Sequence, residues 1–356
     1  LYREAFDLAK QSSGEDSLDA ADAANNLGVF LSDRSQFDEA ETLYRYVLKI
    51  YGQKLSQDDP RRVSSLSNFA QVLEMRDNLS EAETLYREAI ALGREYESNT
   101  PLLAFALSNL SGLLRSQSKN SEAETLLREA LTLQQTIYGD THPDTLITLS
   151  NLASLLSGTS RYKEAETMYR DLLPKLETSF GADHPEVANA LNNFGNTLYQ
   201  QSNYREAKPL LERALAIYEL RSGANSADAT GALSNLAGIA KDEGELESAE
   251  TYYRRQLEVE EMVYGKDSLT VTWTQVNLGA LLVQKGDYDT AETLLSEALQ
   301  TYRQILGENN ESVSWALQQL GTLYFSKGDF AKAQALLLES LELDRALAPV
   351  STQIIS

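Results

Sequence analysis

The chain has 356 residues, and its 53 acidic and 31 basic residues give a formal net charge of −22 at pH 7. So negative a chain repels phosphate backbones, which argues against binding nucleic acid or anionic membranes, and no apolar run approaches the ~18 residues that membrane insertion requires. The absence of cysteine excludes disulfides and thiolate metal sites, and it fits a reducing, cytoplasmic setting.

One seven-residue segment recurs along nearly the whole chain. Glu-Ala-Glu-Thr-Leu-Tyr-Arg occupies 39–45 and 81–87, and edited copies begin at 122, 164, 206, 248, 290 and 332. The intervals are 42 residues, apart from one of 41. A period of this size is typical of a solenoid, in which each unit buries its apolar face against its neighbours.

The repeat sets the expected domain organisation. The opening Leu1-Tyr2-Arg3 matches the middle of the recurring segment, so we expect the chain to begin within a repeat, as a fragment of something longer. We predict one solenoid domain over 1–348, with a half repeat at 1–16 followed by eight repeats of about 42 residues. Residues 349–356 would form a C-terminal tail.

Each repeat contains two stretches with helical periodicity. In the first full repeat, Leu27 and Leu31 lie on one face of the earlier stretch, and Ala40, Leu43 and Leu48 form the stripe of the later one. A short polar turn separates them, which predicts an antiparallel helical hairpin. Small residues recur in the first helix and alanine in the second, as expected where two helices cross closely; they are Gly28, Ala70, Ser111, Ala153, Gly195, Ala237, Gly279 and Gly321, and Ala40, Ala82, Ala123, Ala165, Ala207, Ala249, Ala291 and Ala333.

The links between repeats carry helix-boundary signals. Prolines at 60, 101, 143 and 185 suit the first position of a helix. Asp59, His142 and His184 stand directly before three of them, where a side-chain acceptor caps the helix. Glycines such as Gly139 and Gly265 follow the second helix and suit a left-handed C-cap.

Small residues at one crossing, an unbroken alanine column and an aromatic or leucine at the start of the second helix resemble the tetratricopeptide repeat. The usual period of that family is roughly 34 residues, and the 42-residue form with Glu-Ala-Glu-x-Leu-Tyr-Arg second helices is similar to the kinesin light chain class. The resemblance implies an all-α, right-handed superhelical solenoid of antiparallel helix hairpins. It also implies that the first helices line a concave groove that binds a peptide or protein.

An amide column is the strongest candidate for that groove. It comprises Asn26, Asn68, Asn109, Asn151, Asn193, Asn235, Asn277 and finally Gln319. In the class that the chain resembles, such asparagines hold the backbone of an extended peptide, because an amide both donates and accepts. The alternative is that they bind the neighbouring helix and serve the architecture.

Residues one turn to either side of this column are expected to line the groove as well. The candidates are Asn192, Asn196, Tyr199 and Arg115 in the middle of the chain, and Trp273, Val276, Val283, Trp315 and Phe325 toward the C-terminus. The two tryptophans either anchor a ligand or pack beneath the solenoid or a C-terminal segment. Arg115 and Lys241 are the only cations in the predicted lining, which disfavours a clamp for a C-terminal carboxylate.

Nothing in the sequence indicates an enzyme. The two histidines occupy helix-cap positions, and there is no phosphate-binding glycine loop. The glutamates of the repeated motif recur on faces that we expect to be solvated, so catalytic pairing is not indicated. We therefore expect no catalytic residue, metal or cofactor. The favoured function is a scaffold that binds a protein or peptide partner, and the alternative is a regulatory arm that controls an attached or associated effector such as a protease, kinase or NTPase.

Overall fold

The computed structural model of the protein describes residues 1–96, 100–223 and 225–347. Contacts divide the chain into two compact units, Leu1–Gly181 and Ala182–Ser356. Within the described residues the elements are all helical. The predicted tail at 349–356 lies outside the described residues, and the continuity of all eight repeats as one domain stays a prediction.

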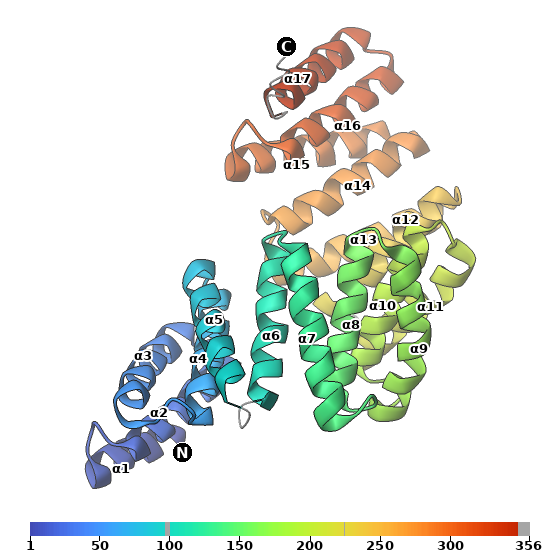
Figure 1. Cartoon of the computed structure of the whole chain (residues 1–356). Coiled ribbons are helices and arrows are strands. Elements are labelled where there is room, and N and C mark those ends of the chain that lie inside the picture. Colours follow the sequence, from blue (N-terminus) through green and yellow to red (C-terminus); the bar gives the residue numbers. More distant parts are fainter. Residues whose placement is uncertain (97–99, 224, 348–356) are drawn as a thin grey trace, which may run out of the picture. The chain divides into compact units, whose positions relative to one another are not determined.

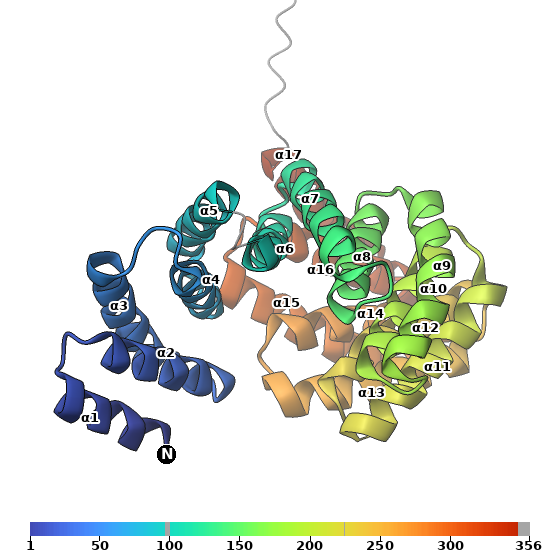
Figure 2. The same cartoon turned by 60° about the horizontal axis from the view of Figure 1, so that its bottom comes forward.

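The first unit begins with the single helix α1, whose sequence matches the second helix of a repeat, and continues as a run of helical hairpins. Figure 2 shows the first helices of the hairpins on one side of this unit and the second helices on the other. The helices are α1 (Tyr2–Ser13), α2 (Leu18–Asp33), α3 (Phe37–Lys54), α4 (Pro60–Met75), α5 (Leu79–Glu95), α6 (Thr100–Ser116), α7 (Asn120–Tyr138), α8 (Pro143–Gly158) and α9 (Tyr162–Phe180).

The second unit repeats the same pattern (Figure 1). Its helices are α10 (Pro185–Gln200), α11 (Tyr204–Ser222), the short 3₁₀ helix η2 (Ala227–Ala229), α12 (Thr230–Asp242), α13 (Leu246–Tyr264), α14 (Leu269–Lys285), α15 (Tyr288–Leu306), α16 (Glu311–Lys327) and α17 (Phe330–Leu347). In both units each first helix pairs with the second helix that follows it, and first helices of successive hairpins also touch, as α4 touches α6 and α14 touches α16. This is the all-α solenoid that the repeat predicts.

The small-residue columns close the hairpins as expected. A Cβ on Gly195 would lie 2.6 Å from Leu211 Cγ, and one on Gly28 would lie 3.1 Å from the ring of Tyr44. Ala165 and Ala207 are fully buried. Because interiors are close-packed, a small residue at these positions lets the two helices of a hairpin approach closely. A larger side chain of the second helix, such as Leu211 or Tyr44, then packs directly against the backbone of the first helix.

The helix boundaries follow the sequence signals, with one correction. Pro60, Pro143 and Pro185 begin α4, α8 and α10, and His142 Nδ1 accepts a hydrogen bond from the Asp144 amide at 3.3 Å. The prediction of a left-handed C-cap is wrong in detail. Gly139 has φ 88° but ψ 174°, an extended conformation with positive φ in which only glycine is unstrained.

Candidate functional site

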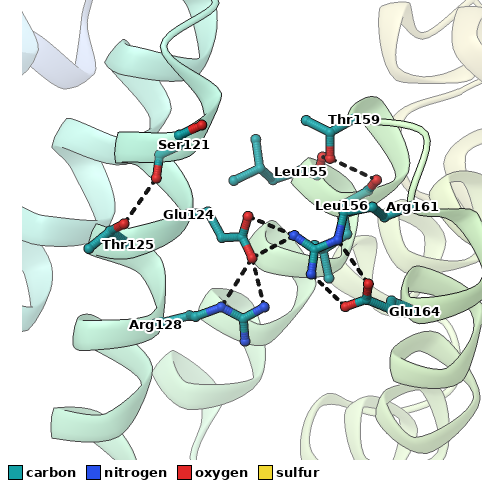
Figure 3. A network of polar contacts seen from close by, with 9 residues as sticks. All are labelled: Ser121, Glu124, Thr125, Arg128, Leu155, Leu156, Thr159, Arg161 and Glu164. Carbon is teal, nitrogen blue, oxygen red and sulfur yellow. Dashed lines mark hydrogen bonds and ion pairs between the residues drawn. The ribbon is translucent and has the colours of Figure 1, made fainter.

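Within each unit, the second helices carry a ladder of ion pairs that joins one repeat to the next. Figure 3 shows one step, in which Glu124 accepts from Arg128 on its own helix and from Arg161 in the following hairpin. The distances are 2.7 and 2.8 Å, and Arg161 also binds Glu164 at 2.6 Å. The Arg128 and Arg161 guanidinium groups lower the pKa of Glu124, with Arg128 contributing most.

The same arrangement recurs along both units. In five of the eight motifs the second glutamate binds the arginine four residues later, at 2.8 Å for Glu83 and Arg87 and at 2.7 Å for Glu250 and Arg254. A cation from the following turn binds the same carboxylate, as Lys119 does at 2.9 Å and Lys285 at 2.6 Å. The expectation that these glutamates lie on solvated faces is therefore wrong for this position, because each is largely covered by its two partners.

One step of the ladder has its charges exchanged. Lys208 stands where six other repeats have glutamate, and its ammonium group lies 3.2 Å from Glu245 and 4.0 Å from Glu243. In some of the other repeats a cation holds one of these two positions, as Arg161 holds that of Glu245 and Lys285 that of Glu243. The exchange preserves an attractive contact. At this step the opposite signs of the two partners are kept, although the residue type at each position is different.

The first helices have very few charges. Within α8 the only charged residue is Asp144, and within α10 it is Glu186, whereas α9 alone contains seven charged residues. The exposed positions of α8 and α10 are filled mainly by amides, hydroxyls and small residues. The acidic character of the chain therefore resides on the second helices and turns.

The asparagine column lies on these nearly uncharged faces. Asn151 is exposed, and Asn68, Asn109, Asn193, Asn235 and Asn277 are partly exposed. Within the described residues, the side chains of Asn68, Asn151 and Asn193 have no hydrogen-bond partner, and Asn109 Nδ2 is buried without one. Asn277 Nδ2 donates to the Trp273 carbonyl on its own helix at 3.0 Å. Among the described residues, Asn235 alone in this column bonds a neighbouring first helix, so most of these amides are not used by the architecture.

Several predicted site residues come together between α10 and α12. Asn235 Nδ2 donates to Asn192 Oδ1 at 3.2 Å, and Gln200 Nε2 donates to Asn196 Oδ1 at 3.4 Å. We call Asn192, Asn193, Asn196, Tyr199 and Asn235 the amide patch. Two glycines of α12 make room for it, since a Cβ on Gly231 would lie 3.4 Å from Asn192 Nδ2 and one on Gly238 only 2.8 Å from the Tyr199 hydroxyl.

A tyrosine pair closes one end of the amide patch. The hydroxyls of Tyr199 and Tyr204 both donate to Asp242 Oδ2, at 3.2 and 3.1 Å, and their ring centroids are 5.8 Å apart. Burial raises the pKa of Tyr199 to about 12, and the Asp242 carboxylate acts in the same direction. The phenol therefore stays protonated and remains a hydrogen-bond donor at neutral pH. Sequence reasoning missed Tyr204 and Asp242 as site residues, because an acid at the end of this first helix occurs in only some repeats and its contact with two tyrosines is not visible as a period.

In the first unit the predicted residues are more dispersed. Arg115 donates to Ser154 Oγ at 3.2 Å, which joins α6 to α8, and Ser108 and Thr148 are in hydrogen-bond contact at 3.3 Å. Asn68 lines a cavity of about 400 Å³ between α2, the turn after it, α3 and α4. Asn109 and Asn151 lie on α6 and α8.

The two tryptophans meet on α14 and α16. Their ring centroids are 6.4 Å apart with an interplanar angle of 36°, and Trp273 is 42% exposed. Trp315 is partly buried and packs against the core of the second unit. Val276 and Val283 are buried, so the prediction that they line the groove is wrong: their faces of α14 point into the hairpin. Phe325 is exposed, as predicted.

Searches for other kinds of site in the described residues gave two results. No group of three or more His, Asp or Glu side chains there is arranged to hold a metal ion. Among the described helices, none combines the length and apolar character needed to cross a membrane.

The sequence model described as "Tetratricopeptide repeat" matches residues 19–95, 61–136, 102–178, 173–219, 228–293 and 270–346. The chain belongs to the tetratricopeptide repeat family. Its 42-residue repeat places it in the kinesin light chain-like class, as the recurring motif indicates. Proteins of this family are generally non-catalytic scaffolds for protein interactions. Among curated proteins, none matches the chain.

Solved structures agree on the fold. BtubC (BKLC) from P. vanneervenii is similar at a TM-score of 0.53 with 24% identity, over 65% of this chain and 91% of that one. The apo form of the quorum sensor NprR from B. thuringiensis is similar at a TM-score of 0.70 with 14% identity, over 96% of each chain. At these identities the likeness concerns the fold alone.

Proposed function

We propose that the chain binds an extended segment of a protein or peptide partner along the first-helix faces, with the column asparagines holding the backbone of that segment. The single observation that supports this most strongly is the unequal use of polar groups. The second helices pair their charges with one another, whereas Asn68, Asn151 and Asn193 carry amides without partners in the described part of the chain. An exposed amide can donate to and accept from a passing peptide backbone.

The nearly uncharged lining also bears on the kind of partner. Long-range attraction from a groove requires a concentration of one sign of charge, which α8 and α10 do not have. Recognition would therefore rest on backbone hydrogen bonds and on the exposed Trp273. Nucleic acid is not the expected partner, and a cytoplasmic setting belongs to the same proposal. Control of an effector is the alternative, and it would use the same faces.

A pair of amide substitutions tests the proposal. A random peptide display library panned on the chain supplies a binding peptide whose affinity is then measured by titration calorimetry. Asn151→Ala with Asn193→Ala should weaken that affinity about tenfold, because each lost hydrogen bond contributes roughly 0.5–1.5 kcal/mol. The free energy of unfolding should change by less than about 0.5 kcal/mol.

The matched control is Gln53→Ala with Gln135→Ala, which removes two exposed amides from second helices. It should leave both affinity and stability unchanged. If the asparagine pair lowers the melting temperature without lowering affinity, the amides are architectural and the proposal is wrong.

A further inference from the structure

The surface beside Asn68 is hollowed into an open pocket between α2, α3 and α4. It encloses about 400 Å³ and is lined by Val29, Ser32, Asp33, Ser35, Phe37, Tyr44, Asn68, Gln71, Val72 and Met75. We call it the turn pocket. Its volume falls within the range of roughly 300–1,000 Å³ typical of ligand sites, and its ten lining residues are half apolar or aromatic and half polar.

Two features of the local sequence shape the pocket. Tyr44 packs against Gly28, where a Cβ would lie 3.1 Å from the ring, and the Tyr44 side chain is buried between the helices. Ser32, which also lines the pocket, is a small residue at a position held by Glu74 in the next repeat and by Tyr199 in the second unit. Met75, which is 64% exposed, borders the mouth from α4.

The charges around the turn pocket are unbalanced. Asp33 lines it and makes no hydrogen bond or ion pair with any described residue. The two nearby cations are engaged elsewhere, since Arg34 lies over the Phe30 ring and Arg76 binds Asp38 and Glu41. Burial raises the pKa of Tyr44 to about 12, and the Asp33 carboxylate acts in the same direction. The pocket thus combines the apolar side chains of Val29, Tyr44 and Met75 with polar ones and with the exposed carboxylate of Asp33, which has no cation partner among the described residues.

We propose that the turn pocket binds one large apolar side chain of a partner segment that carries a positive charge directly beside it. The apolar group would enter between Tyr44, Val29 and Met75, and the cation would meet Asp33. This inference rests on the proposed function, in which a partner segment runs along the first helices. It adds the chemistry of one anchoring residue, which the amide column does not specify.

Three small probes and the methionines of the chain provide a direct test. Tryptophanamide is cationic, N-acetyltryptophanamide is neutral and N-acetyltryptophan is anionic, while all three present the same indole. The chain has three methionines, at 75, 168 and 262, so methyl-labelled methionine gives three signals. Met75 borders the pocket, and Met262 is a matched control because it is 62% exposed on α13 of the other unit.

The proposal expects the probes to shift the Met75 signal while Met262 stays in place, with affinity in the order cationic, neutral, anionic. One partly exposed ion pair contributes about 0.2–1 kcal/mol, so the cationic probe should bind up to about fivefold more tightly than the neutral one. Asp33→Asn should abolish that preference. Asp77→Asn, which removes the same charge from the next turn, should preserve it. Gln71→Trp should fill the mouth and weaken all three probes.

Equal shifts at Met75 and Met262, no shift at Met75, or a charge preference that survives Asp33→Asn would each overturn the proposal. These outcomes are independent of the asparagine test. If the probes bind but Asn151→Ala with Asn193→Ala leaves peptide affinity unchanged, the pocket stands and the proposed function fails. If the probes do not bind but Asn151→Ala with Asn193→Ala weakens peptide affinity, the proposed function stands and only the turn-pocket proposal fails.

Discussion

The first and second helices of this chain use polar side chains in opposite ways. On the second helices, Glu124, Arg128 and Arg161 bind one another and join successive hairpins. On the first helices, Asn151 and Asn193 have no partner in the described residues although both are accessible. The stability of a repeat protein is the sum of the intrinsic stabilities of its repeats and of the contacts between neighbouring repeats, and the ion pairs of the second helices belong to those contacts. The comparison indicates that stability and recognition are assigned to different helices.

The tryptophan pair belongs to first helices but combines both roles. Its substitution is expected to change the free energy of unfolding more than any other change described below. Trp315 packs against the core and Trp273 is 42% exposed. Trp315→Ala should lower the free energy of unfolding by about 2–3 kcal/mol, since it opens a cavity in partly buried packing. Trp273→Ala should cost less than about 1 kcal/mol but weaken peptide binding. Urea unfolding and calorimetry distinguish the two roles; equal losses of stability would place both tryptophans in the architecture.

A buried acid between α13 and α14 provides the second test. Glu260 is 2% exposed, and it accepts from Gln256 Nε2 at 2.9 Å and from Thr274 Oγ1 at 2.6 Å. Burial raises the pKa of Glu260 above its ordinary 4.5. Between these two pKa values the folded protein holds a proton that the unfolded chain has lost, so the free energy of unfolding falls as the pH rises through that window.

Glu260→Gln removes this dependence, because an amide has no proton to lose. Its N–H can also donate to Gln256 Oε1, which is buried without a partner in the described structure. The variant should be more stable than the parent by on the order of 1 kcal/mol at pH 7, and the difference should shrink below about pH 4. Urea unfolding from pH 3.5 to 8 measures it. A constant difference across that range would mean that Glu260 does not titrate on folding.

The exchanged step of the ladder gives the smallest effect. Lys208→Glu places a third carboxylate beside Glu243 and Glu245 and should cost about 0.5–1 kcal/mol at low salt. Adding Glu245→Lys should restore most of the loss, and high salt should reduce both effects. Melting temperatures of the two variants at two salt concentrations provide the measurement. Without rescue, the ladder would be a set of independent surface contacts.

The sequence predicted those features of the fold that recur in every repeat. Helix starts such as Pro143 and Tyr162, the His142 cap and the crossing at Ala207 all follow from residue types at a fixed period. What could not be predicted depends on differences between repeats. The turn pocket depends on the combination of side chains around one turn, among them Ser32 and Met75, and the burial of Val276 and Val283 depends on which face of α14 packs against its neighbours.

The candidate site was predicted in part, for a related physical reason. The asparagine column can be recognised in the sequence because it recurs once in every repeat. Its recurrence does not show whether an asparagine side chain has a hydrogen-bond partner in the folded chain. The ladder did leave a usable signal. Opposite charges recur 35 to 37 residues apart, as Glu124 and Arg161 do, and Lys208 and Glu245 keep that spacing with the two signs exchanged.

The exchanged step also bears on how a chain of similar repeats folds without error. Hairpins this alike can stack in the wrong order, with one left out or taken from another molecule, which is a known failure of repeat proteins. If the hairpin containing Lys208 stacked directly on the one containing Lys285, that lysine would take the place of Glu243 beside Lys208, with Asp287 in the place of Glu245. If the turn containing Glu245 stacked on a helix that carries Glu250, two glutamates would meet. Both mistakes bring like charges together, which disfavours the wrong arrangement. A single reversed pair therefore distinguishes one stacking contact from the others in an otherwise repetitive chain.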